Sequence, residues 1–186
     1  KNYFYGLPWI LRENGYFASS YHGYLSSFWN REYVYPQIGF QNSYFEDDYV
    51  LGEIIGFGLN DFDFFEQSMD YIKDTKGKNF HFIVTLSCHK PYTIPQELME
   101  IELSENDDNI FGNYLNAARY FDNALGEFIQ SLKDNNLYDD SVIILDLEKI
   151  TQDHSAKTMI TDFPLFNQEN YSGLIDVLNA IDNAKT

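Results

Sequence analysis

The chain has 186 residues, of which 44% are hydrophobic and 18% aromatic, and its formal net charge is −17. These values suit one globular domain, or a large part of one, and exclude a disordered segment. The negative charge argues against nucleic-acid binding, because neutralising phosphates needs clustered Lys and Arg. An anionic ligand must therefore be held by a local site that works against the charge of the whole chain.

Neither a membrane span nor an intrachain disulfide is expected. There is no run of about 18 apolar residues, and Cys88 is the single cysteine. The chain shows no signal peptide and begins at Lys1 rather than at a methionine. We therefore expect it to be a piece of something longer.

The first third of the chain predicts a helix, a strand and a second helix or turn. Leu7 to Asn14 is amphipathic, with a proline in its first turn and a glycine directly after it, which indicates a short helix. Tyr16 to Tyr21 is predicted as a strand that brings His22 to its carboxyl end. Trp29 to Ile38 is predicted as a helix or turn.

The remainder predicts two longer helices and two buried strands. Helical spacing of apolar residues predicts helices over Asp61 to Lys76 and Asn109 to Asn135. Phe80 to Ser87 and Ser141 to Leu147 are apolar runs rich in β-branched residues, as in parallel strands buried on both faces. Alternating helices and buried strands predict an α/β fold, with a mainly parallel sheet and helices on both faces.

Two groups of polar residues follow predicted strands. Ligands of parallel sheets gather at the carboxyl ends of the strands, and both His22 and His89 fall just past such ends. The guanidinium of Arg31 can bind two oxygens of a phosphate or sulfate, while Trp29 can form a pocket wall. The alternatives are a structural corner at residues 22–31 and a solvent-exposed loop histidine at position 89.

Three stretches resemble lipoteichoic acid synthases, extracellular members of the sulfatase/alkaline phosphatase superfamily. They are HGYLSSFWNREYVYPQIGF from His22, TLSCHKPY from Thr85, and NYLNAARYFDNALGEFIQSLKDNNLYDDSVII from Asn113. The resemblance extends from Leu7 to Leu145 in unbroken order. It implies a sulfatase-like α/β domain, of which this chain is a part.

The resemblance also implies a function and its residues. In the family the matching side chains surround a phosphoglycerol group, so His22, Trp29, Arg31 and His89 are the expected substrate-binding residues. The implied activity is that of a metal-dependent phosphoglycerol transferase in teichoic acid or cell-envelope glycerophosphate chemistry. A membrane-anchored parent protein would place the site on the extracellular face of the membrane. The implied ligand is phosphoglycerol or a teichoic acid-like anionic polymer.

Two departures from the family pattern bear on catalysis. The threonine nucleophile and one acidic metal ligand of the family precede the region where this chain begins. The family's Gly-Asp-His signature after the SVI strand is replaced by Asp146-Leu147-Glu148-Lys149. The complete family uses Mn²⁺ or Mg²⁺, whereas we expect this chain to bind no metal and to be inactive alone. Asp153 and His154 are a candidate displaced ligand pair.

Three hypotheses therefore remain open. The chain is part of a phosphoglycerol transferase, a non-catalytic module that binds glycerophosphate or an anionic polymer, or a fragment without activity of its own. We treat residues 1–186 as one partial domain whose tail, residues 146–186, departs from the family pattern. An upstream segment or a partner chain would complete the sheet.

Overall fold

The computed structural model describes residues 4–103 and 109–145. The chain divides into two units, residues 1–138 and residues 139–186. The first unit contains all the helices and strands described below. Of the second unit, only residues 139–145 are described.

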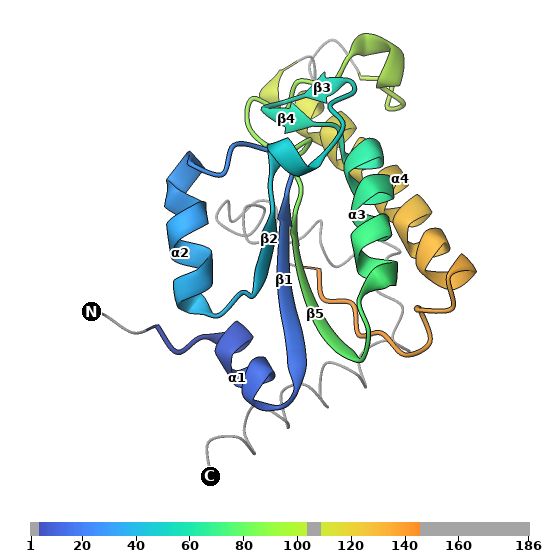
Figure 1. Ribbon diagram of the computed structural model, residues 1–186. Helices are drawn as coiled ribbons and strands as arrows, with labels where there is room; N and C mark the ends of the chain where they lie inside the picture. The colour runs from blue at the N-terminus through green and yellow to red at the C-terminus, as the bar shows by residue number, and fades with distance from the viewer. Residues whose placement is uncertain (1–3, 104–108, 146–186) are drawn as a thin grey trace. The chain divides into compact units, whose positions relative to one another are not determined.

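The first unit is built on a three-stranded parallel sheet with the strand order β2-β1-β5 (Figure 1). The strands are β1 (Tyr16–His22), β2 (Asn42–Tyr44) and β5 (Lys78–Val84). In the register of β1 and β5, His22 lies opposite Val84. The carboxyl ends of β1 and β5 therefore meet at one edge of the sheet, which we call the carboxyl edge.

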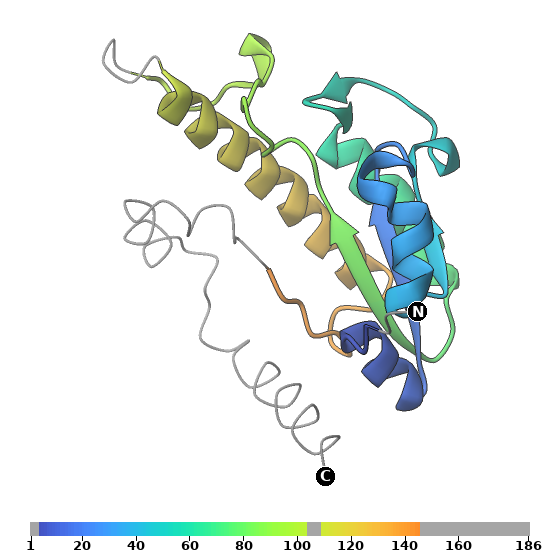
Figure 2. The ribbon, with the colours of Figure 1, turned by 90° about the vertical axis from the view of Figure 1, so that its left-hand side faces the viewer.

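Helices cover both faces of the sheet (Figures 1 and 2). On one face Tyr44 of β2 stacks on Tyr71 of α3 (Asp61–Asp74), with ring centroids 4.1 Å apart. On the opposite face lie α1 (Leu7–Glu13) and α2 (Arg31–Ile38). The predicted α/β class, with a parallel sheet between helices, is confirmed.

Phe82 of β5 is anchored on the α1 and α2 face. Its ring lies 5.7 Å from that of Phe40 and 6.4 Å from that of Tyr35. Because side chains alternate along a strand, His22 and Ser20 of β1 point to this same face, while Tyr21 points to α3. The alternation decides which helix each functional residue of β1 can meet.

The predicted long helix is α4 (Ile110–Asp134), which packs along α3. Asn109 caps its start by accepting hydrogen bonds from the amides of Phe111 and Gly112. Phe128 stacks on Phe65 of α3 with centroids 4.7 Å apart. None of the helices within the described ranges combines the length and the hydropathy of a membrane span.

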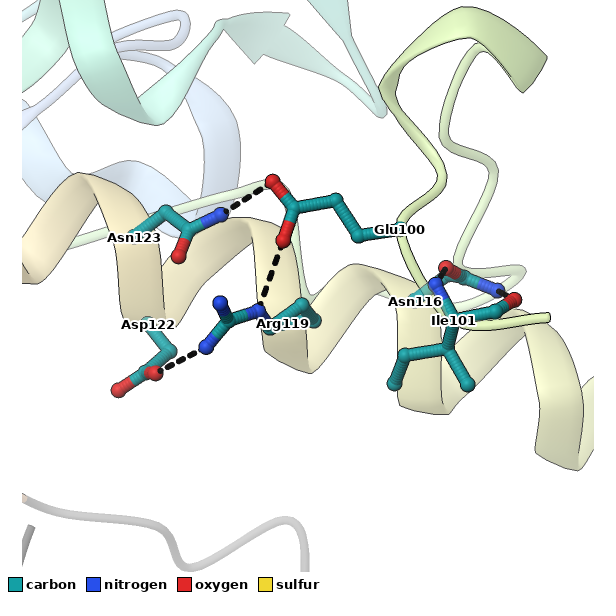
Figure 3. Close-up of polar contacts among 6 residues, drawn as sticks. All are labelled: Glu100, Ile101, Asn116, Arg119, Asp122 and Asn123. Atoms are coloured by element: carbon teal, nitrogen blue, oxygen red, sulfur yellow. Dashed lines mark hydrogen bonds and ion pairs between the residues drawn. The ribbon is translucent and has the colours of Figure 1, made fainter.

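Polar contacts tie the segment before the described gap to α4 (Figure 3). The Asn116 side chain accepts a hydrogen bond from the Ile101 amide at 2.9 Å and donates one to its carbonyl at 3.3 Å. Glu100 accepts from Arg119 and Asn123, each at 2.9 Å. The connection that follows His89 is therefore held on the surface of α4.

A short antiparallel hairpin that the sequence analysis did not predict lies near the carboxyl edge (Figure 1). Its strands are β3 (Ile54–Ile55) and β4 (Gly58–Leu59). The turn residue Gly56 has φ +74°, a conformation that favours glycine. The remaining short elements are 3₁₀ turns at Phe28–Asn30, Glu46–Asp48 and Gln96–Leu98.

Both predicted buried strands need correction. β5 ends at Val84 instead of Ser87, and Phe82 is 42% exposed, because β5 is an edge strand with one neighbour among the described residues. Residues 141–145 form no strand and are largely exposed, and positions 146 and 147 lie outside the described residues. A β-branched sequence favours extended backbone but does not supply the neighbour that a strand must bond to. The expected tail, residues 146–186, also lies outside the described residues.

Candidate functional site: an anion-binding corner at the carboxyl edge

His22 ends β1 and is buried, with 2% of its surface exposed. Its Nδ1 lies 3.1 Å from the carbonyl oxygen of Val84. A carbonyl oxygen only accepts, so Nδ1 carries the proton. Burial lowers the pKa of His22 from 6.5 to about 4; the bond to Val84 opposes that shift, while the Arg31 charge adds to it. His22 is therefore neutral at pH 7, and Nε2 is an acceptor.

The Nε2 atom of His22 is buried and has no hydrogen-bond partner within the described residues. Such an orphaned acceptor is unfavourable unless a donor reaches it. His22 therefore offers a ligand an acceptor instead of a donor for an anion. A hydroxyl group is the kind of partner this nitrogen fits.

Arg31 begins α2 and is 7% exposed. Its Nε donates to the hydroxyl of Tyr35 at 3.0 Å, and Nη1 donates to the carbonyl of Phe28 at 3.3 Å. A guanidinium has five N–H groups, so about three remain without a hydrogen bond in the described part of the chain. None of the described carboxylates forms an ion pair with Arg31.

An unpaired buried cation is costly, and this chain has an excess of carboxylates that could have paired with it. The other two arginines show the contrast. Arg119 pairs with Glu100 and Asp122 at the surface, and Arg12 donates to a backbone carbonyl at 3.1 Å beside α1. Arg31 alone combines burial with free donors among the described arginines.

Trp29 stands beside the guanidinium in a strained conformation. Its φ is +56°, and the next residue, Asn30, has φ +55°, a region that bulky L-residues rarely adopt. Trp29 is 74% exposed, and its indole stacks on Phe28 at 5.6 Å and lies 5.1 Å from the guanidinium carbon of Arg31. The turn thus presents a flat apolar wall next to a positive charge.

His89 follows β5 in the loop that starts at residue 85. Its Nδ1 donates to the carbonyl of Lys90 at 2.7 Å, so Nε2 is the ring nitrogen left for another partner. The imidazole meets the ring of Phe57 edge-to-face, with centroids 4.5 Å apart and an interplanar angle of 83°. Phe57 belongs to the turn of the β3–β4 hairpin.

A continuous series of ring contacts joins the two predicted clusters. We call it the aromatic row, and its members are His89, Phe57, Tyr24, Phe28 and Trp29. Tyr24 is central: its centroid lies 6.3 Å from Phe57, 5.3 Å from Phe28 and 6.5 Å from His22. The structure thus brings all four sequence-predicted residues to one edge of the sheet. Their role in ligand binding stays a prediction.

Tyr24 and Phe57 were missed by the sequence analysis. Tyr24 directly follows the His-Gly pair, and Phe57 stands between two glycines in a short apolar stretch, IIGFGL. A residue flanked by glycines in a tight turn is a recognisable hairpin signal. Nothing in the sequence says that this turn lies beside His89.

Asp61 is a third residue that sequence reasoning overlooked. It is fully buried at the start of α3, and its Oδ1 accepts hydrogen bonds from the amides of Leu86 and Ser87 at 3.1 and 3.2 Å. Burial raises its pKa from 3.8 to about 6, although these two amides and the Ser87 hydroxyl lower it in part. These bonds explain why β5 ends early, because residues 86 and 87 bind a carboxylate instead of a strand.

The fold and the site define a class of protein: an α/β domain with a parallel sheet whose carboxyl edge carries a buried, unpaired arginine beside an aromatic wall. Comparison with known proteins then gives the family. The chain belongs to the Sulfatase family, which it matches over residues 1–156.

Several relatives are known. The chain is 37% identical over 159 residues to a lipoteichoic acid synthase of Staphylococcus saprophyticus, and the match includes 83% of this chain and 25% of the synthase. The crystal structure of the lipoteichoic acid synthase LtaP from Listeria monocytogenes is similar with a TM-score of 0.71 and 32% identity, over 75% of this chain and 35% of that one. The resemblance found in the sequence is therefore confirmed.

A more distant structure shares the fold. The phosphoglycerol transferase GacH of Streptococcus pyogenes matches with a TM-score of 0.51 and 19% identity, over 66% of this chain and 34% of that one. The present chain spans about a quarter of the length of the curated synthase it matches.

Metal ions are in general use in this family, so we tested whether the described residues fit one. Within residues 4–103 and 109–145, no group of three or more His, Cys, Asp or Glu side chains could hold a metal ion. The orphaned Nε2 of His22 is a single potential ligand. The described residues therefore form no metal site, and positions 146–154, which include the predicted replacement ligands, lie outside them.

Proposed function

We propose that this chain provides the phosphoglycerol-binding side of a sulfatase-family phosphoglycerol transferase. The observation that carries the proposal is Arg31, which is buried without a carboxylate partner in a strongly acidic chain. A guanidinium with free donors is suited to a phosphate, because the planar fork can bind two oxygens at once.

The neighbouring residues are suited to contact different parts of the ligand. With Nδ1 donating to Lys90, the Nε2 atom of His89 can accept a hydrogen bond from a hydroxyl of the ligand, while the exposed indole of Trp29 forms an apolar wall for the carbon chain. The Nε2 of His22 would accept a hydrogen bond from a glycerol hydroxyl. This atom is covered, so the ligand reaches it only if side chains around it, such as Tyr24, move aside.

The names of relatives agree with this ligand class. The similar curated proteins are lipoteichoic acid synthases, and GacH was solved in complex with sn-glycerol-1-phosphate. We infer that the ligand is a glycerol phosphate unit of a teichoic acid-like polymer, on the extracellular face of a membrane-anchored parent protein. We expect the 186-residue chain to bind this unit without turning over a phosphodiester.

Isothermal titration of the purified chain with sn-glycerol 1-phosphate tests the proposal. Replacing Arg31 with alanine should weaken binding by about 1.5–3 kcal/mol, the usual loss of a charge-assisted pair. Lysine keeps the charge but loses the planar fork, so R31K should recover only part of the affinity.

Arg12 offers a matched control. Its guanidinium carbon also lies over an indole, 4.4 Å from the ring centroid of Trp9, but Arg12 belongs to α1 and not to the carboxyl edge. The R12A variant should bind like the wild type. Equal binding by wild type and R31A, or no binding by the wild type, would contradict the proposed function.

A further inference from the structure

The β3–β4 hairpin contacts both loops that carry the candidate site. The Leu59 amide donates to the carbonyl of Gly23, the residue after His22, at 3.1 Å. A Cβ atom on Gly58 would collide with that same carbonyl oxygen, and one on Gly56 would lie 3.2 Å from the carbonyl oxygen of Leu86. The two glycines therefore let the hairpin backbone approach the loop after β1 and the loop after β5 at once.

Phe57 lies at the tip of this hairpin and is 46% exposed. Packing in the core does not explain its place, because the core would bury the ring. Its contacts are with site residues instead: the imidazole of His89 at 4.5 Å and the ring of Tyr24 at 6.3 Å. An edge-to-face pair has a preferred geometry, so Phe57 restricts how the imidazole can rotate.

Two contacts then fix the imidazole of His89. The bond from Nδ1 to the Lys90 carbonyl sets which nitrogen faces away from the loop, and the ring of Phe57 restricts the ring plane. A hydrogen-bonding group that is already oriented loses less conformational entropy when it binds a ligand. Held in this way, Nε2 already faces away from the loop as an acceptor before the ligand arrives.

We infer that Phe57 is a positioning residue of the anion site, which orients His89 for the ligand that Arg31 holds. The inference rests on the proposed function for its ligand, but not for its geometry. Phe57 acts through the imidazole and needs no contact with the ligand. The hairpin thus contacts both the loop after β1 and the loop after β5, and it places Phe57 against His89.

The first measurement is ligand affinity in a double-mutant cycle with sn-glycerol 1-phosphate as the probe. F57A should bind about three- to tenfold more weakly than the wild type, the range expected for losing one aromatic pair. F57L retains apolar bulk without a ring and should lose affinity to a similar extent, whereas F57Y should bind like the wild type. In an H89A background, F57A should cause no further loss, because its effect passes through His89.

The second measurement needs no ligand. Heteronuclear NMR of the imidazole protons reports the ring-current effect of Phe57 on His89. These signals should shift in F57A and F57L and stay near their wild-type positions in F57Y, while those of His22, which is not in ring contact with Phe57, should change little in all three. This pattern separates a local change from loss of the fold.

The outcomes distinguish the two proposals. If the wild type binds and F57A binds equally well, the positioning role is overturned and the proposed function stays intact. The same conclusion follows if F57A lowers the affinity further in the H89A background. If the wild type does not bind, the proposed function fails, and the NMR signals still decide the geometry. Unshifted His89 signals in F57A would then overturn the inference, and shifted signals would support it.

Discussion

Asp61 allows a stability prediction in which a buried charge and two buried hydrogen bonds are separated. Its carboxylate has 0% exposure and accepts from the amides of Leu86 and Ser87. Alanine removes the charge and leaves both amides unpaired, at about 1–3 kcal/mol each. Asparagine removes the charge but keeps an oxygen for the amides. The two variants therefore differ in these hydrogen bonds and in the small space that alanine leaves.

The cost of burying the Asp61 charge can be estimated separately from the two hydrogen bonds. Burial raises the pKa of Asp61 from 3.8 to about 6, which makes the ionised form at pH 7 less favourable in the folded chain by about 3 kcal/mol. We therefore expect D61N to be at least as stable as the wild type at pH 7. D61A should be about 2–4 kcal/mol less stable than D61N.

The pH dependence follows from the direction of the shift. The folded pKa lies above the unfolded one, so folding favours the protonated carboxyl. Its contribution is complete below pH 3.8 and is lost as the pH rises through about 6. The stability of D61N relative to the wild type should therefore fall by up to about 3 kcal/mol between pH 7 and pH 4.

Urea unfolding followed by far-UV circular dichroism at both pH values would measure these differences. Equal stability of D61N and D61A at pH 7 would refute the reasoning, because the two amides would then have found other partners. A difference between D61N and the wild type that does not change with pH would refute the assigned pKa.

Three further predictions concern stability. G58A should destabilise the chain by about 1–3 kcal/mol, because the new Cβ atom meets a backbone carbonyl. G126A lies in α4 with nothing within 4 Å of the new Cβ atom and should stabilise the chain by about 0.5–1 kcal/mol. Equal melting temperatures of the two variants would contradict this prediction. Burial lowers the pKa of His22 and of His81 from 6.5 to about 4. Folding favours the neutral rings, so their contribution to stability is complete above pH 6.5 and is lost as the pH falls to about 4, by up to about 3 kcal/mol for each ring. In H81N the urea midpoint should therefore fall less steeply between pH 6.5 and pH 4 than in the wild type. An unchanged slope would contradict the lowered pKa of His81. N116A should lower the free energy of unfolding by about 1–3 kcal/mol, because it leaves the Ile101 amide without its acceptor. A loss below about 0.5 kcal/mol, the usual effect of a surface substitution, would argue that the Asn116 contacts drawn in Figure 3 do not stabilise the fold.

The sequence by itself determined the elements that depend on local pattern. Periodic apolar residues and their caps predicted the helices at Leu7–Glu13, Asp61–Asp74 and Ile110–Asp134 to within two residues at either end. The β-rich stretch before His22 predicted β1. The motifs around His22, Arg31 and His89 predicted the family, because they preserve residue types and order along a long segment.

The tertiary structure decided everything that depends on a partner distant in sequence. Val84 fixes the tautomer of His22, and residues 86 and 87 leave the sheet because Asp61, about 25 positions earlier, accepts their hydrogen bonds. Phe57 reached His89 only through the folded hairpin. Local sequence sets backbone preference, but pKa shifts, strand ends and ring contacts arise from burial and from neighbours that only the fold supplies.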